Sequence, residues 1–336
     1  IKMRKKIFVT RQGGIGDVIL ATPILAELKK LYPDWYITLL VFPNAVEIIK
    51  GLPFIDEVFV YNKENVSFLD LWKKMHGYDI ALYLDLAYRP AMIGFLAGIP
   101  VRVGIEHKRK FWLSRKIKWQ EYMDHTYEPY VLGDIVKEGL GINISHENLN
   151  RLYIASANET DCYDLDAKLS QNGIKTSEKY IVSSPTTAFY LKNWPLDSWN
   201  ELYRRLYQNY GIKTVIFGSG NLNYNWDTEA VVDLWGQLNL RQVGELIKDA
   251  CLLVNSCSLP IHIAAAMETP SVVLYGFTDS RRWAPRERCQ IVSLNLPCSP
   301  CDGYHGSTCT DPKCMDGMSV DMVYDSCARV IIDLKV

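Results

Sequence analysis

Long apolar segments without polar alternation recur through the first third of the chain, and segments with helical spacing of apolar residues separate them. A strand that is apolar on both sides has to be covered on both sides, which is typical of a parallel sheet between two layers of helices. The pattern predicts strands at 6–10, 36–42, 57–61, 79–85 and 101–105, and helices at 18–31, 45–50, 68–76 and 90–97. The predicted fold class is therefore α/β, with a doubly wound parallel sheet.

The same pattern starts again near residue 180, with strands predicted at 180–184, 214–218, 231–234, 252–255 and 271–275. Residues 156–178 are polar and carry no strand pattern, so we place a domain boundary there. A chain of 336 residues is long enough for two separate cores. We predict two Rossmann-like domains, at 1–160 and 175–336, that bind ligands at the carboxyl ends of their strands.

Charge and hydropathy argue against two classes of protein. The net charge is −1, whereas a nucleic-acid-binding protein needs a basic face. No apolar run approaches the about 20 residues of a membrane span. The N-terminal residues 1–6 are basic, but no cleavage-site pattern follows them. We therefore expect no signal peptide and a cytoplasmic location.

A glycine-rich turn follows the first predicted strand and opens the first helix: Gly13, Gly14 and Gly16 precede Asp17. A dinucleotide fingerprint is one reading, but Ile19 stands where that pattern has its last small residue. A carboxylate at this place would repel a pyrophosphate, whereas it suits a base beside an uncharged hydroxyl. An aspartate that only caps the helix is the structural alternative.

A second turn between a strand and a helix is a candidate anion site. Asn255, Ser256 and Cys257 end an apolar run and lead into an alanine-rich helix, whose first N–H groups have no helical partner. His262 follows near the start of this helix and adds a donor for the same anion, unless it is only a core histidine. Thr278 lies in the polar loop after the next predicted strand.

The loop after the first strand of the second series carries Thr186, Thr187 and Lys192 ahead of a helix that begins at a proline. Hydroxyl donors and a lysine within one loop suit a diphosphate. A solvated loop lysine is the alternative. If the diphosphate is a leaving group, Lys192 would assist the reaction as well as binding, because negative charge builds up there.

Four of the nine cysteines lie within seventeen residues, with the spacing C-x2-C-x7-C-x4-C. Two such pairs fit a tetrahedral thiolate site for zinc or iron, while a loop without metal is the alternative. A metal bound by four thiolates would be structural, because no coordination position stays open. The candidate ligands are Cys298, Cys301, Cys309 and Cys314, with His305 as a replacement ligand.

The segment 107–130 is basic and aromatic, and we expect it to leave the first sheet as an excursion. Lysines and arginines alternate with Phe111, Trp112 and Trp119 between residues 108 and 119. This pattern suits an anionic acceptor or a membrane surface. A solvated excursion whose aromatic rings pack on the sheet is the alternative.

Taken in their order along the chain, these motifs resemble those of glycosyltransferase family 9, the heptosyltransferases of lipopolysaccharide synthesis. That family carries the glycine-rich turn with an aspartate, and Thr and Lys before a Trp-Pro pair, here Trp194-Pro195. Many members also have a Cys-x2-Cys and a later Cys-Met, matched by Cys314-Met315. A subgroup that glycosylates autotransporter proteins binds iron through such cysteines. The resemblance implies the GT-B fold, in which two Rossmann-like domains face each other across a cleft.

The resemblance also implies the reaction. An inverting glycosyltransferase of this type moves a heptose or similar sugar from a nucleotide diphosphate donor, here expected to be ADP-heptose, to a hydroxyl of the lipopolysaccharide core or of a glycoprotein. The N-terminal domain would bind the acceptor and the C-terminal domain the donor. Asp17 would be the base and Lys192 would hold the diphosphate, so no catalytic metal is expected. Such an enzyme works in the cytoplasm and can contact the inner face of the membrane peripherally.

Two departures from the family pattern keep alternatives open. The family usually has Asp-Ser-Gly where this chain has Asn255, Ser256 and Cys257. Relatives often carry a glutamate for the ribose after the first glycines of the next loop, where this chain has 221–223 with no acidic residue. A catalytically degenerate GT-B protein that binds nucleotide sugars or serves as a scaffold is one alternative. A nucleotide-sugar epimerase is the other, although it needs a base at the sugar carbon for which we find no candidate.

Overall fold

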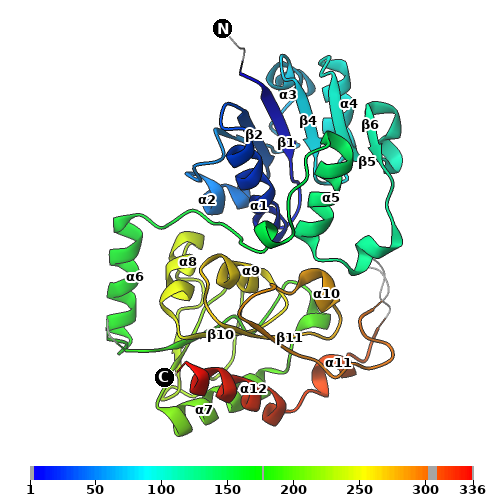
Figure 1. Ribbon diagram of the computed structural model, residues 1–336. Coiled ribbons are helices and arrows are strands. Elements are labelled where there is room, and N and C mark those ends of the chain that lie inside the picture. Colours follow the sequence, from blue (N-terminus) through cyan, green and yellow to red (C-terminus); the bar gives the residue numbers. More distant parts are fainter. Residues whose placement is uncertain (1–3, 176–177, 302–308, 335–336) are drawn as a thin grey trace. The chain divides into compact units, whose positions relative to one another are not determined.

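The computed structural model describes residues 4–175, 178–301 and 309–334. Contacts within the chain divide it into two compact units, Ile1–Ala155 and Ser156–Val336. In Figure 1 each unit is built around its own sheet, with helices packed against it.

The sheet of unit 1 has six parallel strands in the order β3-β2-β1-β4-β5-β6. The chain therefore winds outward in one direction from β1 and in the other from β4, which is the doubly wound arrangement. The strands are β1 Lys6–Thr10, β2 Tyr36–Val41, β3 Glu57–Val60, β4 Ile80–Tyr83, β5 Val101–Ile105 and β6 Arg115–Ile117. The helices are α1 Ile15–Leu31, η1 Pro43–Ala45, α2 Val46–Ile49, α3 Phe68–Met75, α4 Tyr88–Leu96, η2 His107–Trp112, η3 Glu121–His125, α5 Glu128–Leu140 and η4 Glu147–Leu149.

Strand β1 lies at the centre of this sheet and is apolar on both faces, as its sequence predicts. Ile7, Phe8 and Val9 are all fully buried. Phe8 points to the face where α3 and α4 pack, in a cluster that includes Leu71 and Ala91. Because successive side chains alternate, Ile7 and Val9 point to the opposite face of the sheet.

The sheet of unit 2 repeats this topology, with six parallel strands in the order β12-β11-β10-β7-β8-β9. The strands are β7 Ile181–Ser183, β8 Thr214–Ile216, β9 Val231–Asp233, β10 Leu252–Ser256, β11 Ser271–Leu274 and β12 Cys289–Val292. The helices are α6 Glu159–Gln171, η5 Tyr190–Lys192, α7 Leu196–Tyr210, α8 Leu240–Asp249, α9 Leu259–Ala266, α10 Ser280–Trp283, α11 Lys313–Asp316 and α12 Val320–Asp333. In Figure 1, α8 and α9 lie on one side of β10 and β11, and α7 and α12 lie on the other.

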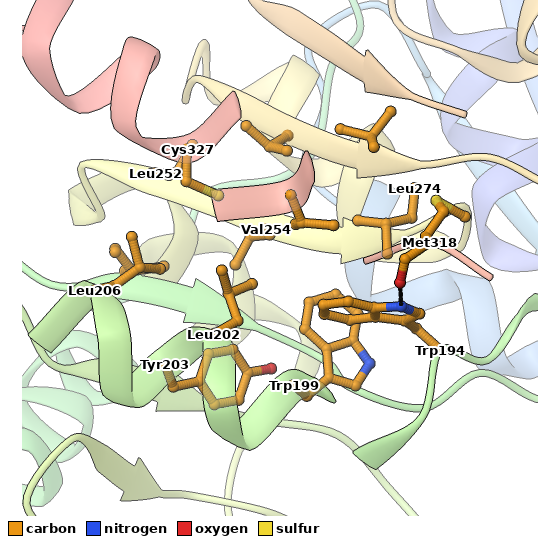
Figure 2. Packing of buried hydrophobic residues seen from close by; sticks show 14 of the residues in the cluster. Trp194, Trp199, Leu202, Tyr203, Leu206, Leu252, Val254, Leu274, Met318 and Cys327 are labelled. Carbon is orange, nitrogen blue, oxygen red and sulfur yellow. Dashed lines mark hydrogen bonds between the residues drawn. The ribbon is translucent and has the colours of Figure 1, made fainter. Parts of the chain in front are cut away.

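The core between α7, α12 and the sheet is rich in aromatic side chains (Figure 2). Trp194 and Trp199 are buried with their rings nearly perpendicular, 4.9 Å between centroids. The Trp194 indole Nε1 donates a hydrogen bond of 2.9 Å to the carbonyl oxygen of Met318. This bond satisfies the polar atom of a buried ring and ties the loop ahead of α7 to the segment ahead of α12.

The structure corrects one prediction for unit 1. Residues 107–130 do not leave the sheet entirely, because β6 pairs in parallel with β5, with Ile105 opposite Ile117. Arg115 and Lys116 are exposed and only Ile117 is buried, so this edge strand lacks the apolar run on which the prediction depended. Short, charged strands are common at the edges of sheets, where they discourage pairing with other chains.

Candidate functional site

In each unit the two central strands mark the point where the chain changes direction, and ligands of doubly wound sheets bind at the carboxyl ends there. In unit 2 these strands are β7 and β10. The side-chain oxygen of Asn255 accepts a hydrogen bond of 2.6 Å from the backbone N–H of Ser184, which follows β7. Its amide nitrogen donates to the carbonyl of Ser256 and the hydroxyl of Ser258. Asn255 is fully buried, so we expect it to hold the two strand ends together rather than to touch a ligand.

Helix α9 begins directly after this turn. Ser258 is its N-cap residue, but its side chain makes no capping hydrogen bond, and a proline lies in the first turn. The first N–H groups of a helix have no helical partner, and the helix dipole favours an anion beside them. The hydroxyl of Ser256 is also buried and has no hydrogen-bond partner in the part of the chain that the structure describes.

His262 is the fourth residue of α9 and is only 5% exposed. Burial, together with the positive charge of Lys192, lowers the pKa of His262 to about 3. The imidazole is therefore neutral near pH 7. Its Nδ1 is buried and finds no hydrogen-bond partner among the described residues. A neutral ring of this kind offers one N–H donor without adding charge.

Lys192 lies at the end of η5, on the loop that follows β7. Its charge lowers the pKa of His262, and it also opposes the rise in the pKa of Cys257 that burial causes. The structure therefore brings Lys192, His262 and Cys257 together, although they are far apart in the sequence. Thr278 and Tyr275 also oppose the rise in the pKa of Cys257 that burial causes, which adds Thr278 to the same group.

The two threonines ahead of Lys192 differ in their contacts. The hydroxyl of Thr187 donates to the carbonyl of Phe189 at 2.9 Å, and the backbone N–H of Thr187 donates to the side-chain oxygen of Asn193 at 2.7 Å. These bonds fix the turn that carries Lys192. Thr186 precedes this turn and is partly exposed.

Two hollows lie at the same end of the unit 2 sheet. One of about 400 Å³ follows β8 and is lined by Asn223, Tyr224 and Asn225. The other, of about 270 Å³, follows β11 and β12. It is lined by Tyr275, Gly276, Thr278, Asp279, Ser280, Arg281, Ser293, Asn295, Ser299 and Pro300.

In unit 1 the candidate base lies at the corresponding place, after β1. Asp17 is in the first turn of α1, and its Oδ2 accepts a hydrogen bond of 2.9 Å from the backbone N–H of Gly14. A side chain at Gly13 would place its Cβ 2.8 Å from this oxygen, so the glycine makes room for the carboxylate. Asp17 thus makes the capping contact of the structural alternative. Its side chain also stays 33% exposed, so it can reach a ligand.

Arg11 links Asp17 to a buried carboxylate that the sequence did not point to. One nitrogen, Nη2, contacts Oδ1 of Asp17 at 3.1 Å and Oε1 of Glu128 at 2.7 Å. Burial by itself would lower the pKa of Arg11, whereas the charges of Glu128 and Asp17 raise it. The net effect is a raised pKa. Arg11 and Glu128 are almost fully buried, so the guanidinium is charged and fixed.

A second arginine completes this network. Asp85, after β4, accepts hydrogen bonds from the backbone N–H groups of Gln12 and Ala87 and lies 3.5 Å from Nη1 of Arg109. Arg109 is 1% exposed and also donates to three backbone carbonyls. The prediction that the basic residues between 108 and 119 face an anionic acceptor or a membrane is therefore wrong for Arg109, because its side chain is used inside unit 1.

The four clustered cysteines lie near one another in unit 2. Burial raises the pKa of Cys314 to about 11, and the charges of Cys301, Cys298 and Cys309 act in the same direction. The backbone N–H of Cys301 donates to the carbonyl of Phe277 at 3.1 Å. Among the described residues, no group of three or more His, Cys, Asp or Glu side chains is arranged to hold a metal. His305 lies outside the described residues.

No helix in the described part of the chain has the length and apolar character needed to cross a membrane.

The chain was compared with known proteins. The model of "Glycosyltransferase family 9 (heptosyltransferase)" matches residues 68–309. A lipopolysaccharide heptosyltransferase 3 of Escherichia coli is 24% identical over 290 residues, which cover 80% of this chain and 83% of the relative. A glycosyltransferase family 9 structure from Veillonella parvula superposes with a TM-score of 0.82 at 20% identity, covering 98% of both chains. The structure of E. coli ADP-heptose lipopolysaccharide heptosyltransferase II gives a TM-score of 0.76 at 19% identity, covering 98% of this chain and 100% of that one.

Proposed function

Because the chain belongs to glycosyltransferase family 9 and is a glycosyltransferase with the GT-B fold, we propose that it transfers a heptose from ADP-heptose to a hydroxyl of the lipopolysaccharide core. The relatives that cover most of the chain carry the names of lipopolysaccharide heptosyltransferases, which supports this donor and acceptor. In this proposal unit 2 binds the nucleotide sugar and unit 1 binds the acceptor.

The observation that carries the donor site is the convergence of one cation and one helix N-terminus in unit 2. Burial lowers the pKa of His262, and the charge of Lys192 adds to this effect. The same charge opposes the rise in the pKa of Cys257 that burial causes. His262 lies near the start of α9, and Cys257 lies just before this helix. A diphosphate placed there would meet Lys192, the positive end of the α9 helix dipole and the neutral imidazole of His262. Lys192 would also stabilise the charge that develops on the leaving diphosphate.

The nucleoside end of the donor would meet an amide-rich loop. The hollow after β8 is lined by Asn223, Tyr224 and Asn225, and residues 221–223 contain no carboxylate. The side-chain amide of asparagine can donate a hydrogen bond to a ribose hydroxyl or accept one from it. Asparagine could therefore take the place of a carboxylate, although its hydrogen bond would be weaker than one to a charged group.

For the acceptor we propose that Asp17 takes the proton of the attacking hydroxyl. Its Oδ1 and Oδ2 are held by Arg11 and Gly14, and its exposed edge leaves room for a hydroxyl. Gly13 and Gly14 form the turn that presents this carboxylate, and Gly16 precedes Asp17 in the first turn of α1. The network around it holds three carboxylates and two guanidinium groups, and the accessible carboxylate is that of Asp17.

We also propose a structural metal, zinc or iron, at Cys298, Cys301, Cys309 and Cys314. Thiolates are ligands that bind zinc and iron well. Besides burial, the charges of Cys301, Cys298 and Cys309 raise the pKa of Cys314, so the four side chains lie near one another. A bound metal would deprotonate these thiols and tie the four cysteines to one another. Four thiolates would leave no position for substrate, so the transfer step runs without it.

For location, we propose the cytoplasm, with contact at the inner face of the cytoplasmic membrane, where an acceptor built on a lipid would lie.

The donor site is tested by calorimetric titration of ADP and ADP-heptose into the Lys192→Ala variant. Loss of a charge-assisted contact should weaken the binding of both ligands by about 1.5–3 kcal/mol. Lys179→Ala, an exposed lysine of the same unit, is the control and should bind as the wild type does. Equal affinities of the Lys192→Ala variant and the wild type for ADP would contradict the assignment.

A second assay separates the enzyme from the two alternatives. Without acceptor, a transferase slowly releases ADP from ADP-heptose by transfer to water. A protein that only binds nucleotide sugars releases none, and an epimerase converts the sugar while the nucleotide stays attached. Release of ADP that rises when a lipopolysaccharide core acceptor is added is the expected result.

A further inference from the structure

Helix α4 and the neighbouring η2 of unit 1 expose a patch of apolar side chains that is bordered by positive charge. We call it the α4–η2 face, and its members are Tyr88, Phe95, Leu96, Arg102, Lys108, Lys110, Phe111 and Trp112. Phe95 and Leu96 are 44% and 50% exposed, and Phe111 is 77% exposed. The ring of Trp112 lies 6.1 Å from that of Tyr88 and 5.3 Å from that of Phe95, so the patch is continuous.

This exposure belongs to well-anchored elements and not to a loose loop. The Nε of Arg102 donates to the carbonyl of Trp112 at 2.7 Å, and its guanidinium lies 5.2 Å from the centre of the Phe95 ring. The indole Nε1 of Trp72, on α3, donates to the carbonyl of Leu96 at 3.1 Å. A fixed apolar patch in water is unfavourable, and such patches mark surfaces that bind something.

The charge of this part of the chain differs from that of the rest. Eight lysines and arginines and one acidic residue, Glu106, lie between residues 86 and 120, although the whole chain has a net charge of −1. Lys108 and Lys110 are exposed, and neither has an ion-pair partner among the described residues. The Nζ of Lys110 lies 5.5 Å from the centre of the Phe111 ring, so apolar and positive groups are interleaved.

We propose that the α4–η2 face docks unit 1 on the surface of an anionic lipid bilayer. Phe95, Leu96 and Phe111 would enter the boundary between headgroups and acyl chains, and Lys108 and Lys110 would meet lipid phosphates. Aromatic and aliphatic side chains bordered by lysines are the composition of interfacial membrane-binding surfaces. A saccharide acceptor fits this face less well, because hollows lined by polar groups, such as the one that contains Thr278, suit sugars better.

The inference specifies which surface makes the membrane contact, and it rests on the proposed function only for the presence of a lipid-anchored acceptor at that membrane. It can be tested apart from catalysis. The wild-type chain is sedimented with vesicles of phosphatidylcholine alone and with vesicles of equal parts phosphatidylcholine and phosphatidylglycerol. We expect binding to the anionic vesicles that weakens as salt is raised, because screening shortens the reach of the lysine charges.

Two double variants separate charge from apolar contact. Lys108→Glu with Lys110→Glu should weaken binding to the anionic vesicles by at least about tenfold, since each lysine near such a surface contributes on the order of a fivefold effect. Leu96→Ser with Phe111→Ser should weaken it while leaving the salt dependence in place. The matched controls are Lys63→Glu with Lys137→Glu, and Tyr163→Ser with Ile332→Ser, which make the same changes at exposed positions elsewhere.

Face variants that bind like their controls, or a wild type that does not distinguish the two vesicle types, would overturn the proposal. Unchanged vesicle binding together with a raised KM for a soluble, deacylated acceptor would instead assign the face to the saccharide. Transfer to that soluble acceptor without vesicles should be the same for the face variants and the wild type. A wild type that binds anionic vesicles but transfers no sugar would contradict the proposed function and leave the membrane surface standing.

Discussion

Asp17 is the solvent-exposed end of a chain of buried charges. Arg11 contacts both Asp17 and Glu128, and the contact to Glu128 is the shorter, 2.7 Å against 3.1 Å. Asp85 and Arg109 form the adjoining pair. Because Glu128 is buried and holds the same guanidinium nitrogen, it fixes Arg11 beside Asp17. Glu128 is therefore a positioning residue for the proposed base.

We predict that Glu128→Gln lowers kcat for transfer while the dissociation constant of ADP-heptose stays at its wild-type value. The variant removes the shorter of the two contacts of Arg11, so the guanidinium beside the proposed base is held less firmly. Turnover is measured with saturating donor and acceptor, and donor binding by calorimetry. Glu138→Gln, an exposed glutamate on the same helix, is the control and should leave kcat unchanged. A Glu128→Gln variant that turns over like this control would show that Glu128 does not position the base.

The sequence led to Asp17 but not to its partners, for a physical reason. The glycine-rich turn and the aspartate are neighbours in the chain, so their spacing carries the signal. Glu128 is 117 positions from Arg11 and belongs to α5, which the pattern of apolar residues did not reveal. Arg11 directly follows the buried strand β1, and a charge at such a place needs a carboxylate nearby. This position was the signal in the sequence that could have pointed to a buried partner.

At the scale of elements, α5 packs against β5 so closely that one of its glycines is required. A Cβ on Gly139 would lie 2.0 Å from Cγ1 of Val103 and 3.2 Å from its Cβ. Valine is branched at Cβ and cannot turn these atoms away easily. At Gly133, on the same helix, the nearest atom to a new Cβ is the end of the Leu149 side chain, at 2.7 Å. That atom can move by a change of rotamer.

Gly139→Ala should therefore destabilise the protein by about 1–3 kcal/mol, although the same change in an open helix position stabilises by up to about 1 kcal/mol. Gly133→Ala is the matched comparison and should cost clearly less. Chemical denaturation of both variants, followed by circular dichroism, measures the difference. Equal stabilities of the two variants would mean that α5 moves away from β5 at little cost.

The central strands of both sheets could be predicted from the sequence, because β1, β2, β4, β10 and β11 are continuous apolar runs. The edge strands β6 and β12 could not, since each has exposed residues and few buried ones. The donor loop shows the same limit: the spacing identified Lys192 and His262 separately, whereas their proximity arises only when β7 and β10 pair. The prediction for the segment between residues 108 and 119 failed at Arg109, because nothing local in the sequence indicates that Asp85 lies beside it.

The cysteine cluster makes a prediction about stability. If the four thiols bind one structural metal, protein purified without chelator should contain about one zinc or iron per chain. Removal of the metal should lower the melting temperature more than it lowers the turnover of the molecules that remain folded, because the site is closed to substrate. Substoichiometric metal together with four thiols that titrate freely would assign the cluster to an ordinary loop.

At the scale of the whole molecule, two units with the same strand order carry different chemistry. Unit 1 offers an accessible carboxylate after β1, and unit 2 offers a lysine, a neutral histidine and a helix N-terminus after β7 and β10. In each case the residues lie where the chain reverses its direction of winding, which is where this topology opens toward ligands. This arrangement supports our proposal that unit 1 binds the acceptor and holds the base and that unit 2 binds the donor.

The most direct test of this assignment compares transfer and donor binding in Asp17→Asn. Asparagine keeps the size and one hydrogen-bond acceptor of the aspartate but cannot take up the proton. We predict that kcat for transfer from ADP-heptose falls by about 10²- to 10⁴-fold, the usual contribution of a general base. The dissociation constant of ADP-heptose should stay within about threefold of the wild-type value, because the proposed donor contacts are all in unit 2. Transfer at the wild-type rate, or a loss of donor affinity as large as the loss of rate, would contradict the account.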